Sequence, residues 1–177
     1  PDLFQIYNCR NISVSDITLQ NSPFWTFHPV YSSSLDISSV SVRNPYDSPN
    51  TDGINIDSCH GVRVHGCTVD VGDDGISMKS GCNESGIRRA LLTHDVEVCG
   101  CTVLHAHGGI VIGSDSSGGV HDVSVHDCRF IGTDRGIRLK TRRGRGGDVH
   151  DISISDIDID GCLAAFTVNM YYRCGAY

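Results

Sequence analysis

A short motif ending in Gly-Ile recurs four times along this chain of 177 residues, and it carries most of the side chains that could do chemistry. Each copy continues as an alternating segment whose apolar positions match from copy to copy. The polar positions change from carboxylates to an imidazole and then to cations. The copies read Thr51-Asp52-Gly53-Ile54, Asp73-Asp74-Gly75-Ile76, His107-Gly108-Gly109-Ile110 and Asp134-Arg135-Gly136-Ile137. A scaffold that repeats while its polar side chains vary can build a site by stacking.

The spacing of the copies predicts where these side chains meet. If the four Gly-Ile steps lie on neighbouring coils, Asp52 falls one rung from Asp74, and His107 falls one rung beyond Asp73. Two cations follow on alternate positions of the last copy, so they face the same side. The resulting patch spans about four rungs, or ~15 Å, and comprises Asp52, Asp73, Asp74, His107, Arg138 and Lys140.

Three carboxylates this close cannot all ionise freely, so at least one is expected to have a raised pKa and to supply a protonated acid beside ionised bases. That pairing suits glycoside hydrolysis, in which one carboxylic acid protonates the leaving oxygen and another carboxylate activates water. Cations beside the acids suit a substrate that itself bears carboxylates. The sequence predicts a local basic wall made of Arg135, Arg138, Lys140, Arg142, Arg143 and Arg145.

A second pattern, apolar-x-apolar-x-x-apolar-x-apolar, predicts the elements that position this patch. Its six copies recur at spacings of 23 to 34 residues, alternate with period two and break phase once, as at a corner between two short strands. The first residues of the copies are Ile12, Leu35, Val62, Val96, Val123 and Ile152. The pattern predicts an all-β fold, a right-handed parallel β-helix of several coils that forms one domain over residues 1–177.

The repeat also accounts for the cysteines. The chain has nine, an odd number, so they cannot all pair within it. Cys67, Cys101 and Cys128 occupy the same repeat position and are expected to stack in the interior as small hydrophobes. No Cys/His cluster tight enough for zinc is apparent, and neither a metal nor a cofactor is expected. The longer insert from Gly81 to Thr93 is expected to be a surface loop.

Composition limits the partners. The formal net charge of −7 disfavours wholesale binding to nucleic acid or to a membrane surface. No apolar run of transmembrane length and no signal-peptide pattern is present. The chain opens in the middle of the repeat pattern, and neither end resembles a cap, so a fragment of a longer protein is expected. The sequence gives no indication of oligomeric state.

Four ordered motifs resemble the polygalacturonases, family 28 of the glycoside hydrolases, and most closely the bacterial exo-acting members. The motifs are Asn50-Thr51-Asp52, Gly72-Asp73-Asp74, Ala106-His107-Gly108 and Arg138-Leu139-Lys140, and their order and spacing agree with the family over about 90 residues. Two positions depart from the family pattern, since Ala106 replaces a glycine and Leu139 replaces an isoleucine. The first change could alter the pose of His107.

The resemblance implies a parallel β-helix that hydrolyses α-1,4-galacturonosyl linkages of a galacturonan with inversion and without a metal. Asp73 would be the general acid, and Asp52 and Asp74 would hold and deprotonate the attacking water. His107 would tune the protonation of Asp73 or hold the substrate. The carboxylates should stand wide enough apart to admit a water. Substrate binding would fall to Arg138, Lys140, Asn50 and one of Tyr171 and Tyr172.

Other functions remain open at this point. A pectate-lyase-like β-helix would cleave the same polymer by elimination with calcium, which an Asp-rich stack could hold. A rhamnogalacturonan hydrolase is a nearer alternative, although such enzymes typically lack the His motif. A non-catalytic carbohydrate-binding β-helix is the third. Exo action and an extracellular or periplasmic location are implied by resemblance alone, and a cytoplasmic location is also open.

Overall fold

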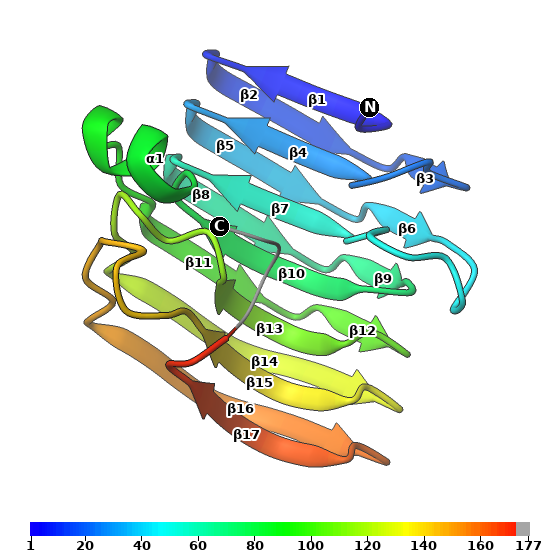
Figure 1. The fold of residues 1–177 in the computed structure, drawn as a ribbon. Coiled ribbons are helices and arrows are strands. Elements are labelled where there is room, and N and C mark those ends of the chain that lie inside the picture. Colours follow the sequence, from blue (N-terminus) through cyan, green and yellow to red (C-terminus); the bar gives the residue numbers. More distant parts are fainter. Residues whose placement is uncertain (173–177) are drawn as a thin grey trace.

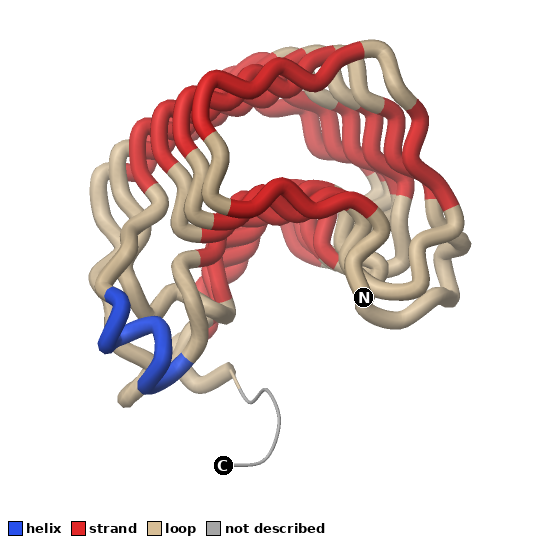
Figure 2. Tube along the Cα trace, turned by 90° about the horizontal axis from the view of Figure 1, so that it is seen from above, coloured by secondary structure: helices blue, strands red, loops and turns tan. Residues whose placement is uncertain are grey.

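The computed structural model describes residues 1–172 and contains a right-handed parallel β-helix, as the repeat predicts. Successive coils stack in chain order from the N-terminal strands to the C-terminal ones (Figure 1). Viewed along the stack, the strands of each coil lie over those of the next (Figure 2). No helix in the described part of the chain is long and apolar enough to cross a membrane.

Two parallel sheets form the walls of the solenoid. The first has seven strands, which are β1 (Phe4–Tyr7), β4 (Phe27–Val30), β7 (Ile54–Asp57), β10 (Asp74–Lys79), β13 (Gly108–Gly113), β15 (Arg135–Lys140) and β17 (Ala164–Asn169). This sheet carries the Gly-Ile motifs. Its strands pair in that order, so each motif lies beside the copy in the next coil.

The second sheet has ten strands and contains the other repeat pattern. Its strands before the corner are β2 (Arg10–Ser15), β5 (Ser33–Ser38), β8 (His60–His65) and β11 (His94–Cys99). Its strands after the corner are β3 (Thr18–Gln20), β6 (Ser41–Arg43), β9 (Thr68–Asp70) and β12 (Thr102–Leu104). In the last two coils one strand runs through the corner, giving β14 (Val123–Ile131) and β16 (Ile152–Asp160).

The corner of the second sheet is made by one residue in the left-handed backbone conformation in every coil. The position is filled by residues that tolerate a positive φ, either glycine or a short polar residue. The six residues, with φ between 53° and 61°, are Asp16, Ser39, Gly66, Gly100, Asp127 and Asp156. They coincide with the phase break in the sequence pattern, so the corner is encoded locally in each repeat.

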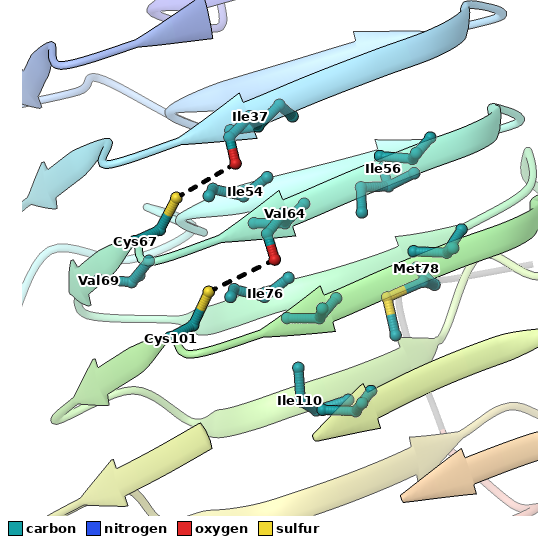
Figure 3. Close-up of a cluster of buried hydrophobic side chains, with 14 of the residues drawn as sticks. Ile37, Ile54, Ile56, Val64, Cys67, Val69, Ile76, Met78, Cys101 and Ile110 are labelled. Carbon is teal, nitrogen blue, oxygen red and sulfur yellow. Dashed lines mark hydrogen bonds between the residues drawn. The ribbon is translucent and has the colours of Figure 1, made fainter. Parts of the chain in front are cut away.

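The interior is a set of ladders of like residues from successive coils. Cys67, Cys101 and Cys128 are each at most 2% exposed, which confirms the predicted cysteine stack. The thiols of Cys67 and Cys101 donate to main-chain carbonyls one coil earlier, at 3.7 Å in each case (Figure 3). A small side chain with a weak donor therefore satisfies a buried carbonyl while still packing as a hydrophobe.

The glycine of each Gly-Ile motif is required by the narrow interior. A Cβ placed on Gly75 would lie 2.6 Å from Cγ1 of Val103, and one on Gly109 would lie 2.5 Å from Cγ of Phe130. Apolar side chains of the second sheet therefore rest directly on the backbone of the first sheet. The recurring glycine is thus set by packing, and it fixes the position of the polar residues that precede it.

The insert after β10 differs from the expectation of a loop. It contains a short helix, α1 (Asn83–Arg89), which begins with Glu84 in its first turn and ends with Arg88 and Arg89 in its last. Opposite charges at the two ends favour a helix, because they complement its dipole. Arg88 also donates to Glu84 at 2.7 Å, one turn away.

The corner residue gives a test of the fold. Gly66→Ala is expected to lower the free energy of unfolding by about 1 kcal/mol, because Gly66 has a left-handed φ of 60°. An added Cβ meets no atom within 4 Å, so the backbone conformation alone accounts for the loss. Urea unfolding followed by circular dichroism measures the change. Ser39→Gly at the equivalent corner is the matched control and should not lose stability. Equal losses in both variants would contradict the backbone explanation.

Candidate active site

The register of the first sheet brings the four motifs together as the repeat predicts. Ile76 pairs with Ile54 on one side and with Ile110 on the other, and Ile110 pairs with Ile137. Backbone hydrogen bonds continue this register into the preceding turns, where the amide of His107 donates to the carbonyl of Asp73 at 2.8 Å. The polar side chains therefore lie close together because the apolar residues that follow them pair in register from coil to coil.

Three carboxylates converge at the start of these strands. Asp52, Asp73 and Asp74 each place an oxygen within 4.8 Å of the others. Asp52 and Asp74 are 3% and 1% exposed, whereas Asp73 is half-buried. The nearest oxygens are thus closer than the ~6.5–9.5 Å between carboxyl groups that is typical of inverting glycosidases, so the spacing does not by itself support the expected gap for a water. Tight stacking of adjacent coils is the physical reason.

Each buried carboxylate has a cationic partner. Lys140 Nζ lies 2.6 Å from Asp74 Oδ2, and Arg138 lies 3.4 Å from the other oxygen of the same carboxylate. Lys79 Nζ lies 3.3 Å from Asp52 Oδ2, with both side chains 5% exposed. A cluster of three carboxylates could hold a divalent cation. Here the side-chain cations already supply the compensating positive charge, so the donor set does not call for a metal ion.

Sequence reasoning missed Lys79. It takes the same strand position as Lys140, because each follows a residue that pairs with Ile112 of the intervening strand, Met78 before Lys79 and Leu139 before Lys140. The alignment of the motif copies that selected Lys140 already includes Lys79 at the same position, and that match is the signal that could have found it. Its ammonium group also lies 4.7 Å from the centre of the Trp25 ring, so an aromatic face shields this buried ion pair.

The carboxylate with the raised pKa is Asp52. Burial is the largest cause, the charge of Lys79 opposes it, and the charges of Asp74 and Asp73 add to it, so that the pKa of Asp52 rises to about 6. Crowding of like charges, which the sequence suggested as the cause, is therefore secondary to loss of solvent. Burial lowers the pKa of Lys79, but the charges of Asp52 and Asp74 more than offset this and raise it.

Asp73 behaves in the opposite way. Burial would raise its pKa, but the hydrogen bond and charge of His107 and the amide of Asp74 together lower the pKa of Asp73 to about 2. His107 Nδ1 lies 3.4 Å from Asp73 Oδ1, and this contact is the main cause that raises the pKa of His107. The amide of Asn50 donates to the second oxygen at 3.2 Å. When Asp73 and His107 share one proton in the free site, that proton therefore resides on His107.

The two tyrosines considered as candidates differ in position. Tyr172 places its ring 5.0 Å from Lys140 Nζ and 5.4 Å from the Arg138 guanidinium carbon. Tyr171 is 76% exposed, and its strand-like bridge is to Arg142. The ring that packs against the two cations of the site is therefore that of Tyr172.

The predicted basic wall is only partly present. Arg145 is 1% exposed and forms an ion pair with Asp115, so it belongs to the interior of the loop that follows β15. Arg135 lies 3.5 Å from Asp134 and is partly neutralised. A run of arginines along the chain does not fix a common face, because the loop folds one of them inward.

The fold and these motifs place the chain among known proteins. The profile of Glycosyl hydrolases family 28 matches residues 1–176, and the chain belongs to this family. A probable polygalacturonase of Vitis vinifera is 38% identical over 173 residues. A solved exopolygalacturonase of Thermotoga maritima superposes with a TM-score of 0.84 at 34% identity, over 90% of this chain. A polygalacturonase of Erwinia carotovora ssp. carotovora has the same fold, with a TM-score of 0.89 over 98% of this chain at 23% identity.

The chain is much shorter than these proteins. The matched region covers 97% of this chain but 35% of the Vitis vinifera protein. It covers 38% of the Thermotoga maritima chain and 44% of the Erwinia carotovora chain. The chain thus spans roughly a third of the length of the curated relatives it matches.

The Asp52–Lys79 contact gives a direct electrostatic test. Lys79→Met is expected to raise the pKa of Asp52 above about 6, because the charge of Lys79 is the largest influence that opposes burial. Carbon-detected nuclear magnetic resonance of the Asp52 carboxyl group as a function of pH measures the shift. Arg129→Gln, which removes an exposed cation paired with Asp158 on the second sheet, is the control. An unchanged Asp52 pKa in Lys79→Met would contradict the assignment.

Proposed function

We propose that this site hydrolyses α-1,4-galacturonosyl linkages of polygalacturonate. The observation that carries the proposal is the convergence of three carboxylates and two cations, Arg138 and Lys140, in a chain of glycosyl hydrolase family 28. The carboxylates supply the acid and base that glycosidic cleavage needs. The cations suit the negative charge of a galacturonate unit.

Asp73 is the proposed general acid. Among the three carboxylates it is the half-buried one, so a substrate oxygen can reach it, and it contacts His107. The proton that His107 holds in the free site would pass from Nδ1 to Asp73 Oδ1 and then to the leaving glycosidic oxygen. A substrate that bears negative charge favours keeping that proton within the pair.

Asp52 and Asp74 are proposed to hold and deprotonate the attacking water. Asp52 suits the role of base, because its pKa is about 6, near the range in which general bases work best. Asp74 is held by Lys140 and Arg138, which fix its orientation. Inversion by a single displacement is proposed on family membership, since the close carboxylates supply no separate argument for it.

Substrate binding is assigned to the cationic edge of the site. Arg138 is the freer of the two cations, because it lies 3.4 Å from Asp74 and its guanidinium has further donors to offer. Tyr172 packs against both cations and is proposed as the tyrosine of the site, while Asn50 acts through its main-chain amide on Asp73. Exo action is favoured by the likeness to the Thermotoga maritima exopolygalacturonase.

Asp73→Asn is expected to lower kcat on polygalacturonate by about 10²–10⁴-fold with little change in substrate binding, because it removes the acid but keeps the shape. New reducing ends measure turnover, and calorimetry with an oligogalacturonate measures binding. Full activity in this variant would overturn the role of Asp73. Unsaturated, ultraviolet-absorbing products from the unaltered chain would instead indicate an eliminating lyase, and binding without cleavage would indicate a carbohydrate-binding module.

Lys140→Ala is expected to raise KM about tenfold or more, because a charged partner of the substrate carboxylate is lost. It should also lower kcat, since Lys140 lies 2.6 Å from buried Asp74 and its removal leaves that carboxylate with one looser partner. Steady-state kinetics on polygalacturonate separate the two effects, and Arg129→Gln is again the control. An unchanged KM would contradict a role in binding.

A further inference from the structure

The outer face of the second sheet carries a cluster of metal-ligating side chains from two adjacent coils. Glu97 and Cys99 lie on β11, and His126 lies on β14, where it pairs directly with Cys99. One donor atom from each of the three lies within 4.8 Å of the others. The cluster is separate from the carboxylate site, which lies on the first sheet.

The imidazole of His126 lies between two carboxylates, those of Asp127 and Glu97. Nδ1 lies 2.7 Å from Asp127 Oδ2, and a carboxylate can only accept, so the ring proton resides there. Nε2 faces Glu97 Oε1 at 3.2 Å. In the free chain a second ring proton on Nε2 bridges these two groups, and a metal ion can take the place of that proton. A carboxylate that holds the far nitrogen of a histidine is also the usual support of a metal-binding histidine.

Glu97 is supported in the same manner. Arg63, one coil earlier, donates from Nε to Glu97 Oε2 at 2.7 Å, and this contact orients the carboxylate. The remaining oxygen, Oε1, is the one that faces His126. Two of the three donors are therefore oriented by second partners before any ligand arrives. The side chains of Glu97 and His126 are 41% and 30% exposed, so an ion can reach them from solvent.

We propose that Glu97, Cys99 and His126 bind a divalent cation of the zinc class, with water in the remaining position. A thiolate, an imidazole and a carboxylate are the donors that zinc accepts, and hard ions such as calcium do not favour the thiolate. Bonds of ~2.0–2.3 Å in a tetrahedron place donors about 3.3–3.8 Å apart. The 3.2 Å contact between His126 and Glu97 is close to that spacing, and the thiol of Cys99 lies within 4.8 Å of both. Binding releases two protons to solvent, the thiol proton of Cys99 and the proton that bridges His126 Nε2 and Glu97 in the free chain.

The linear sequence conceals this site. Glu97 and Cys99 are separated from His126 by a whole coil, so no compact Cys/His motif appears along the chain. The register between β11 and β14 alone makes them neighbours.

The test uses the reduced, metal-free chain with Co²⁺ and Zn²⁺ as probes. One Co²⁺ per chain is expected to bind with a thiolate-to-cobalt charge-transfer absorption, and one equivalent of Zn²⁺ should abolish that absorption by displacement. Cys99→Ser should remove the absorption. Asp127→Asn should weaken Zn²⁺ binding, measured by calorimetry, by about 10–100-fold, because it frees the far nitrogen of His126.

Matched controls come from elsewhere in the chain. Cys162→Ser removes a partly buried thiol outside the cluster, and His105→Gln removes a surface histidine that contacts Asp70. Both variants should keep the absorption and the affinity, and circular dichroism verifies that all variants fold. Absence of the absorption in the unaltered chain, or its persistence in Cys99→Ser, would overturn the proposal.

Discussion

The in-register pairing of successive coils is the constraint on which the rest of this structure depends. Parallel strands lie about 4.8 Å apart, so any two residues at equivalent positions become neighbours whatever their separation in sequence. His60, His94, His121 and His150 show the precision of this register, since their rings stack with centroids 4.9, 5.2 and 4.9 Å apart. The carboxylate site and the Glu97–Cys99–His126 cluster are two products of the same stacking.

Stacking carboxylates brings negative charges close together. Cations at equivalent strand positions compensate these charges. Lys79 and Lys140 align across the first sheet, and each reaches back to a buried carboxylate, Asp52 and Asp74 respectively. Without these partners the two buried charges would be strongly unfavourable. The compensation is uneven, because burial still raises the pKa of Asp52 whereas the contact with His107 lowers that of Asp73. Residues of one type therefore have shifts in opposite directions, and the raised pKa lies on Asp52 rather than on Asp73.

The two faces of the solenoid wall are independent because side chains alternate across a strand. Inward positions of β11 are the packed residues Val96 and Val98, while Glu97 and Cys99 point outward. The outer face can therefore vary its polar residues without disturbing the core. A repeat protein thus has more surface positions in register than one active site uses.

The sequence by itself determined the coil. Its alternation of apolar residues, its phase breaks and the glycine of each Gly-Ile motif predicted the strands, the corners, the cysteine stack and the meeting of Asp52, Asp73 and Asp74. These features are local and periodic, so they can be read without knowing distant contacts. Only the tertiary structure decided that Lys79 partners Asp52, that Arg145 turns inward, that the insert contains α1 and that Cys99 meets His126. Those outcomes depend on burial and on side-chain contacts between coils, which have no periodic signature along the chain.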